Sequence, residues 1–231
     1  LKKHDIDGLI VIGGDGSLTG ARALYKDYGF NVIGLPASID NDIYGTDMSI
    51  GVDTALNNII KCIDMINDTA SSHDRTFLIE VMGRNCGYLA LMSAIASGAE
   101  AALIPEVPYD LDKIIDMLKQ RYKMGKTRSI IVVAEGVGAA ADFGKVIKLM
   151  GGIDTRIMVL GHIQRGGSPT FFDRLLASRM GTVAVESILE GKSGYMTALR
   201  NTRYELVELD TVLSNKKEID SKLMDIAEVL M

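Results

Sequence analysis

Short apolar runs rich in β-branched residues alternate along the chain with longer segments in which apolar residues recur every three or four positions. The short runs lack period-two alternation, which is typical of parallel strands covered on both faces. We predict strands over residues 8–12, 32–35, 77–82, 101–104, 130–134 and 157–160. We predict helices over residues 17–28, 49–69, 86–96, 111–123, 142–150, 173–189 and 218–230. This alternation predicts an α/β fold with right-handed crossovers.

Composition and charge narrow the function. The net charge of −5 argues against a general nucleic-acid binder, whose footprint is basic, so an anionic substrate must be held by local positive charge. The cysteines, Cys62 and Cys86, have no metal-ligand spacing and fit a reducing compartment. No apolar run has the length of a membrane span and no signal peptide is recognisable, so we expect a cytoplasmic protein without membrane contact.

Four of the predicted strands end in polar clusters, three of which contain glycine. These clusters are residues 13–17 (GGDGS), 37–42 (ASIDND), 83–85 (GRN) and 161–167 (GHIQRGG). In open α/β sheets, ligands bind beyond the carboxyl ends of the strands. The polar side chains therefore gather where the topology predicts a ligand-binding crevice.

The first cluster, residues 13–17, follows a strand and opens a helix. Glycines let the backbone approach an anion closely, and the free N–H groups at a helix N-terminus bind phosphate. A carboxylate beside phosphates is repulsive unless a cation lies between them, so Asp15 indicates Mg²⁺. Taken alone, the cluster is equally consistent with a glycine-rich turn that has Ser17 as N-cap. NAD kinases and diacylglycerol kinases carry a similar Gly-Gly-Asp-Gly pattern.

The second cluster contains two acids, Asp40 and Asp42, after the next strand. Acids one residue apart are often only solvated turn residues. Here they follow a strand that is next in sequence to the strand of the first cluster. Phosphoryl transfer to an alcohol needs a base for the hydroxyl proton and a metal that spreads the phosphate charge, and two carboxylates can divide these tasks.

Together these motifs resemble the phosphofructokinase family. The similarity runs through residues 11–17, 38–43, 45–47, 71–75, 80–84 and 161–169, and thus covers essentially the whole chain. It implies two Rossmann-like three-layer α/β/α domains with mostly parallel sheets. The implied ATP-binding domain is residues 1–51 plus 164–214, and the implied fructose 6-phosphate-binding domain is residues 52–163 plus 215–231. Because the chain opens without Met and enters a strand almost at once, we expect the amino-terminal part of the family pattern to be missing.

The resemblance implies a 6-phosphofructokinase, which transfers the γ-phosphoryl group of ATP to the 1-hydroxyl of fructose 6-phosphate in glycolysis. By motif, Asp15 corresponds to the residue that holds Mg²⁺, Asp40 to the base and Asp42 to its acidic neighbour. Ser38 stands where the family usually has threonine, and it keeps a hydroxyl for contact with the transferring group. The other residues of the nucleotide phosphate loop are Gly14, Gly16 and Ser17.

Basic residues would hold the sugar phosphate, since the planar fork of arginine pairs bidentately with phosphate oxygens. The resemblance implies that His162 and Arg165 hold the 6-phosphate in one subunit. It implies that Arg75 and Arg156 reach the same phosphate from a neighbouring subunit, so we expect a homotetramer with shared active sites.

Four further residues correspond to the sugar pocket of the family. Arg84 corresponds to the residue that stabilises the transferring phosphoryl group electrostatically. Glu135 corresponds to the acid that accepts hydrogen bonds from sugar hydroxyls, while Met82 and Gly83 line the same pocket.

Two positions favour ATP over pyrophosphate as the donor. Pyrophosphate-dependent relatives tend to have a larger or acidic residue at position 16 and lysine at position 37, where this chain has Gly16 and Ala37. ATP users commonly have glycine at position 37, so a relaxed donor preference stays open. One alternative is a pyrophosphate-dependent phosphofructokinase. The other is a non-catalytic metabolite-binding subunit, and the retained Asp15 and Asp40 disfavour this second alternative. An NAD kinase is disfavoured by residues 161–169.

Overall fold

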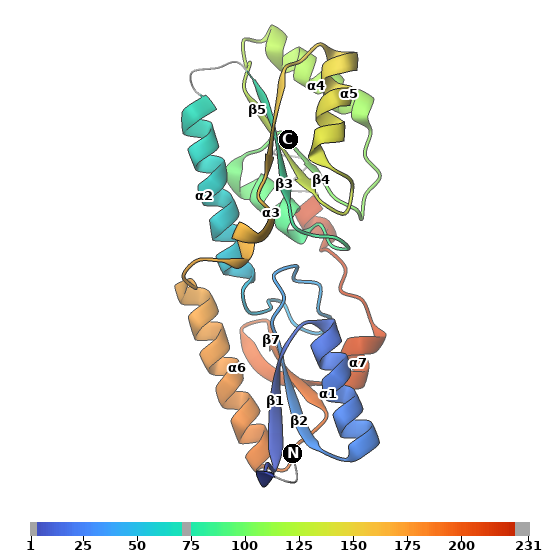
Figure 1. The fold of residues 1–231 in the computed structure, drawn as a ribbon, viewed down its shortest axis with the longest axis vertical. Helices are drawn as coiled ribbons and strands as arrows, with labels where there is room; N and C mark the ends of the chain where they lie inside the picture. Colours follow the sequence, from blue (N-terminus) through green and yellow to red (C-terminus); the bar gives the residue numbers. More distant parts are fainter. Residues whose placement is uncertain (1–3, 71–74, 225–231) are drawn as a thin grey trace. The chain divides into compact units, whose positions relative to one another are not determined.

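The computed structural model describes residues 4–70 and 75–224, in which helices alternate with mostly parallel strands (Figure 1). The predicted α/β fold class is therefore confirmed. The chain divides into a first unit, Leu1–Asp53 with Ser168–Glu218, and a second unit, Thr54–Gly167 with Ile219–Met231. The described residues of each unit form one four-stranded sheet.

The first unit has a sheet in the order β1-β2-β7-β8. Its strands are β1 (Gly8–Gly13), β2 (Asn31–Pro36), β7 (Tyr195–Arg200) and β8 (Arg203–Glu208). The first three are parallel, and β8 is antiparallel to β7. Its helices are α1 (Asp15–Tyr28), α6 (Phe171–Leu189) and α7 (Leu209–Ser214). In Figure 1, α6 lies on one side of this sheet and α1 and α7 lie on the other.

An apolar cluster covers each face of this sheet. The cluster below α1 and α7 contains Leu18, Ala21, Val32, Ile43, Met196, Ala198, Leu209 and Val212. The cluster below α6 contains Ile33, Leu35, Leu176, Met180 and Ala184. Successive residues of β2 thus face opposite clusters, as the pleat of a strand requires. This explains why β2 has a continuous apolar sequence.

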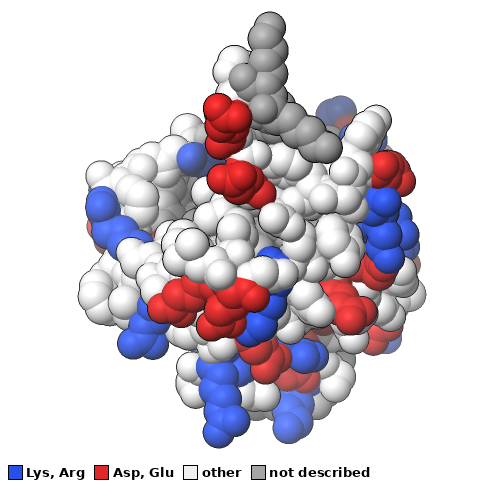
Figure 2. Space-filling model, turned by 90° about the horizontal axis from the view of Figure 1, so that it is seen from below, with Lys and Arg blue, Asp and Glu red and all other residues white. Residues whose placement is uncertain are grey.

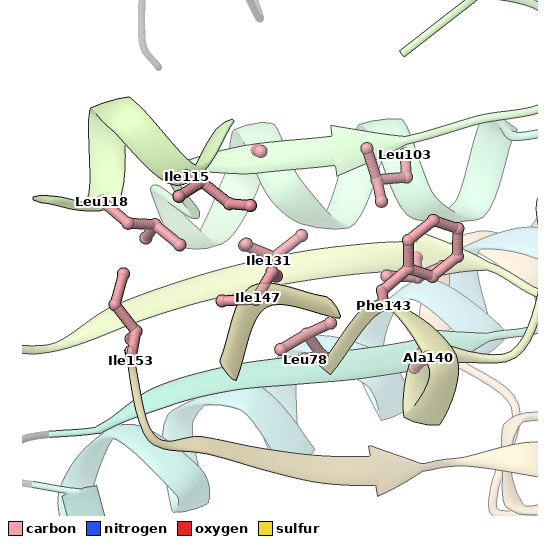
Figure 3. Close-up of a cluster of buried hydrophobic side chains, with 11 residues drawn as sticks. Leu78, Leu103, Ile115, Leu118, Ile131, Ala140, Phe143, Ile147 and Ile153 are labelled. Atoms are coloured by element: carbon pink, nitrogen blue, oxygen red, sulfur yellow. The ribbon is translucent and has the colours of Figure 1, made fainter. Parts of the chain in front are cut away.

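The second unit has an all-parallel sheet in the order β4-β5-β3-β6. Its strands are β3 (Thr76–Val81), β4 (Ala101–Leu103), β5 (Ser129–Ala134) and β6 (Thr155–Val159). Its helices are α2 (Val52–Ala70), α3 (Tyr88–Ser97), α4 (Leu111–Lys123), α5 (Ala140–Gly151) and the 3₁₀ turn η2 (Gly161–Arg165). Figure 3 shows Leu78 and Ile131 of the sheet in one apolar cluster with Ile115 and Leu118 of α4 and Ile147 of α5.

The sequence pattern missed β7, β8 and α7. The hairpin of β7 and β8 turns at Asn201 and Thr202, both with positive φ, so no glycine marks the turn in the sequence. Helix α7 has six residues, which is too short for an apolar period to appear. Of the predicted helix over 218–230, residues 221–224 are helical and residues 225–230 lie outside the described residues, as does most of the 71–75 motif.

Charged side chains of both signs are interspersed on the face of the molecule seen in Figure 2. Within the part of the chain that the structure describes, no helix has the length and apolar character needed to cross a bilayer.

Candidate active site

The turn between β1 and α1 presents an uncapped helix N-terminus. Gly14 is the N-cap, with φ −86° and ψ −167°, and no side chain caps the helix. The interpretation of Ser17 as the N-cap is therefore wrong, because the helix already begins at Asp15. A Cβ on Gly13 would collide with the side chain of Ser17, so a glycine is required there. The first-turn N–H groups are thus available to an anion.

The loop after β2 lies directly beside this turn. The N–H of Ala37 donates to the carbonyl of Gly13 at 3.0 Å, and a Cβ on Gly14 would lie 3.8 Å from Cβ of Ser38. Parallel pairing of β1 and β2 produces this juxtaposition, since their carboxyl ends meet at Gly13 and Pro36. The first two sequence clusters are therefore neighbours in the first unit.

Asp15 and Asp42 interact across these two loops. Burial raises the pKa of Asp15, and the negative charge of Asp42 raises it further. Ser38 Oγ donates to Asp42 Oδ1 at 3.2 Å and so orients that carboxylate. Two carboxylates that repel one another near an uncapped helix N-terminus are suitable ligands for a hard cation.

The donor set suits magnesium better than a metal with an all-protein cage. Among residues 4–70 and 75–224, no group of three or more His, Cys, Asp or Glu side chains is arranged to hold a metal. Mg²⁺ is usually bound through one or two carboxylates, with water and substrate phosphates completing its octahedron. The Asp15–Asp42 pair fits that requirement.

Asn41, which lies between Asp40 and Asp42, stabilises their loop through buried hydrogen bonds. It is 1% exposed, and its φ of 54° is in the left-handed region that asparagine tolerates better than most residues. Its Nδ2 donates to the carbonyl of Asp47 at 3.1 Å, and its Oδ1 accepts the N–H of Ser49 at 3.1 Å. This buried amide therefore fixes the backbone from which Asp40 and Asp42 extend on either side.

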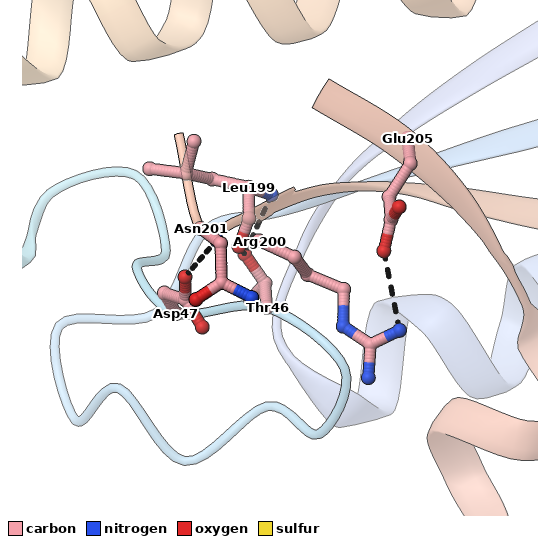
Figure 4. Close-up of polar contacts among 6 residues, drawn as sticks. All are labelled: Thr46, Asp47, Leu199, Arg200, Asn201 and Glu205. Atoms are coloured by element: carbon pink, nitrogen blue, oxygen red, sulfur yellow. Dashed lines mark hydrogen bonds and ion pairs between the residues drawn. The ribbon is translucent and has the colours of Figure 1, made fainter. Parts of the chain in front are cut away.

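The β7–β8 hairpin anchors the far side of the same loop (Figure 4). Thr46 Oγ1 accepts the N–H of Leu199 at 3.1 Å, and the N–H of Asp47 donates to the carbonyl of Leu199 at 2.8 Å. Asp47 Oδ2 accepts the N–H of Asn201 at 2.7 Å. The sequence motif contains Thr46 and Asp47, but their role depends on a hairpin that the pattern did not reveal.

In the second unit, Met82, Gly83, Arg84 and Glu135 lie at the ends of the adjacent strands β3 and β5. The N–H of Glu135 donates to the carbonyl of Val81 at 2.9 Å, and Gly136 N–H donates to the carbonyl of Gly83 at 3.1 Å. A Cβ on Gly136 would collide with the carbonyl of Arg84, so glycine allows the two loops to meet backbone to backbone. Met82 and Gly83 are buried, while Arg84 and Glu135 are exposed.

His162 and Arg165 lie in η2, which follows β6. The β3–β6 ladder continues to the N–H of Leu160, which donates to the carbonyl of Glu80 at 3.0 Å, so η2 begins beside the end of β3. Both side chains are exposed, whereas Gln164 between them is buried. Sequence reasoning gave no role to Gln164.

Arg75 and Arg156 lie at the other end of the same two strands. Arg156 pairs in register with Phe77, near the amino end of β3, whereas His162 follows the carboxyl end of β6. Asp154 accepts ion pairs from Arg75 at 3.3 Å and from Arg156 at 3.6 Å. At about 3.3 Å per residue, the length of β6 separates this pair from His162 by more than 10 Å. One chain therefore does not bring all four basic residues together.

Comparison with known proteins gives a consistent result. The family model for phosphofructokinase matches residues 1–188. ATP-dependent 6-phosphofructokinases from Halalkalibacterium halodurans and Thermotoga neapolitana are 54% and 52% identical over 230 residues, which is 100% of this chain and 72% of each relative. The structure of phosphofructokinase from Saccharomyces cerevisiae superposes with a TM-score of 0.83 at 35% identity, over 99% of this chain and 34% of that chain. The chain belongs to the phosphofructokinase family.

Proposed function

We propose that this chain is an ATP-dependent 6-phosphofructokinase, which moves the γ-phosphoryl group of ATP to the 1-hydroxyl of fructose 6-phosphate. The observation that carries the proposal is the position of the acidic loop, residues 37–51 with Asp40 and Asp42, beside the N-terminus of α1. The chain is also at least 52% identical to relatives named for this activity. That pair of loops combines an anion-binding backbone with carboxylates, which is what phosphoryl transfer to an alcohol needs.

The first unit would bind the nucleotide phosphates and activate the acceptor. The backbone of Gly14, Gly16 and Ser17 would hold phosphate oxygens at the start of α1. Asp15 and Asp42 would hold Mg²⁺, which when bound neutralises phosphate charge. Asp40 would accept the proton of the sugar hydroxyl. The hydroxyl of Ser38 would contact the transferring group.

The space around Gly16 supports ATP as the donor. A Cβ built on Gly16 meets no atom of the described residues within 4 Å, so residues 4–70 and 75–224 leave this side of the helix N-terminus open. Ala37, whose N–H bonds to the carbonyl of Gly13, places no cation beside the loop. A pyrophosphate-dependent enzyme would be expected to compensate for the missing nucleotide with charge at these positions.

The second unit would bind fructose 6-phosphate. Met82, Gly83 and Glu135 would contact the sugar, and His162 with Arg165 would hold its 6-phosphate. Arg84 would stabilise charge on the transferring phosphoryl group. The location of Arg75 and Arg156 at the opposite strand ends supports their contribution to a neighbouring subunit, as in a homotetramer. A cytoplasmic location stays a prediction.

A donor exchange tests the proposal. Formation of fructose 1,6-bisphosphate would be followed with ATP and Mg²⁺, and separately with pyrophosphate and Mg²⁺. We expect transfer from ATP. Transfer from pyrophosphate alone would overturn the donor assignment. Binding of fructose 6-phosphate without transfer from either donor would favour the non-catalytic metabolite-binding subunit.

A further inference from the structure

We infer that Gln164 is a positioning residue: it fixes the turn of the phosphate-binding residues His162 and Arg165 relative to the strand end that carries the sugar-binding residue Met82. The inference rests on the proposed function, because it concerns the fructose 6-phosphate site that we assign to η2 and the end of β3. Gln164 belongs to the turn that carries His162 and Arg165, and its side chain reaches the strand end that carries Met82 and Arg84.

Gln164 is an exception among its neighbours. It is 1% exposed, whereas His162, Ile163 and Arg165 are all exposed. A large polar side chain is rarely buried unless each polar atom has a partner. The burial of a primary amide in a turn whose other side chains are exposed therefore requires a specific set of hydrogen bonds.

The side chain makes one bond of each kind. Its Oε1 accepts the N–H of Met82 at 3.1 Å, and its Nε2 donates to the carbonyl of Gly161 at 2.9 Å. These backbone partners fix the orientation of the amide, because exchanging its O and N would face donor with donor and acceptor with acceptor. Glutamate lacks the donor, leucine lacks both groups, and asparagine is one methylene shorter. Glutamine thus matches the site in both chemistry and length.

The bond to Met82 completes the attachment of the end of β3. The carbonyls of Val81 and Gly83 accept the N–H groups of Glu135 and Gly136 from the β5 side. The N–H of Met82 points to Gln164 instead, so this strand end is held by the β5 loop on one side and by η2 on the other. Gln164 therefore sets the position of the phosphate-binding turn relative to the sugar-binding residues without touching substrate.

Two substitutions and one matched control test this role. Gln164→Leu removes both hydrogen bonds at similar volume, and Gln164→Glu keeps the acceptor for Met82 but removes the donor to Gly161. Ser93→Ala is the control, since Ser93 is fully buried in α3 of the same unit and donates to the carbonyl of Leu89. The dissociation constant of fructose 6-phosphate would be measured by isothermal titration. Steady-state KM for both substrates, kcat and Tm would be measured beside it.

A displaced η2 should weaken sugar-phosphate binding selectively. For Gln164→Leu we expect Kd and KM for fructose 6-phosphate to rise about tenfold or more, with an unchanged KM for ATP. Gln164→Glu should give a smaller rise. Ser93→Ala should change Tm without changing either KM.

Several results would overturn the inference. A role in folding alone would lower kcat in proportion to the folded fraction and leave KM for fructose 6-phosphate unchanged. Unchanged kinetics in both variants would also exclude a positioning role for Gln164. If the leucine variant does not fold, the kinetics of the glutamate variant decide by the same criterion. A wild-type chain that neither binds nor phosphorylates fructose 6-phosphate would refute the proposed function itself, whereas active wild type with unaffected variants would refute only the role of Gln164.

Discussion

The acidic loop of the first unit and the η2 turn of the second unit share one structural feature, a buried side-chain amide flanked by charged residues. Each presents charged side chains around one buried amide, Asn41 in the first case and Gln164 in the second, and both amides are 1% exposed. Each amide accepts one backbone N–H and donates to one backbone carbonyl. A buried side chain of this kind fixes the backbone geometry from which the neighbouring charged side chains are presented.

The two amides differ in how far they reach. Asn41 bonds to Asp47 and Ser49, within its own loop, and its backbone is left-handed. Gln164 bonds to Met82, which is 82 residues away in the sequence. Asn41 therefore determines the shape of one loop, and Gln164 determines the relation between two segments. Defects in the first should appear mainly in kcat, and defects in the second mainly in the affinity for the sugar phosphate.

The largest effect is expected for Asp40→Asn. Loss of the proposed general base should lower kcat about 10²–10⁴-fold while KM for fructose 6-phosphate changes little, and steady-state kinetics measures both. Asp27→Asn removes the same charge from an exposed position of α1 and serves as the control. A fall in affinity with an intact kcat would contradict the assignment of the acidic loop to the chemical step.

Arg165→Ala should show the opposite pattern in the second unit. Loss of its proposed charge-assisted contact with the 6-phosphate corresponds to about 1.5–3 kcal/mol, or roughly a 10- to 150-fold rise in KM for fructose 6-phosphate. Arg128→Ala is the control, since exposed Arg128 donates to the carbonyl of Asn67. If the Arg165 variant lost kcat at unchanged KM, the division of labour between the two loops would be wrong.

Substitution of Asn41 separates the amide from the backbone conformation. Asn41→Gly removes the amide but tolerates the positive φ, so it should lower the free energy of unfolding by about 1–3 kcal/mol for the unpaired backbone groups. Asn41→Ala should cost about 1 kcal/mol more because of its Cβ. Urea denaturation measures both, and equal losses would show that left-handed strain is not part of the cost. Both variants should lower kcat and leave KM for fructose 6-phosphate nearly unchanged.

What the sequence predicted well is carried by local patterns. Continuous apolar runs such as residues 130–134 identify buried parallel strands, and parallel pairing explains how the clusters after β1 and β2 become neighbours. The buried amides could not be recognised, because Asn41 and Gln164 look like solvent-exposed polar residues until their partners are known. The helix start was misplaced because the N-cap position is Gly14, which has no capping side chain to mark it in the sequence. The residue roles themselves, from Asp15 to Arg165, stay predictions.

The smallest predicted effect is a change in thermal stability caused by the charges of Asp15, at the start of α1, and Asp42, in the acidic loop. Burial, followed by the charge of Asp42, raises the pKa of Asp15, so ionisation of Asp15 is less favourable in the folded state than in the unfolded state. Below the ordinary pKa range of aspartate both states are protonated and there is no penalty. The penalty develops as pH rises through the window between the unfolded and the raised folded pKa, and it is complete above that window.

Asp15→Asn should therefore raise Tm slightly at neutral pH and leave it unchanged at a pH below the titration of aspartate. Because Asp15 is an exposed residue whose carboxyl group is only partly buried, solvent screening limits the expected gain to about 1–2 °C. Asp42→Asn should remove part of the same penalty, and Mg²⁺ should stabilise the wild type but not the Asp15 variant. Differential scanning calorimetry with and without Mg²⁺ measures all three. Equal stabilisation of both proteins by Mg²⁺ would place the cation away from Asp15.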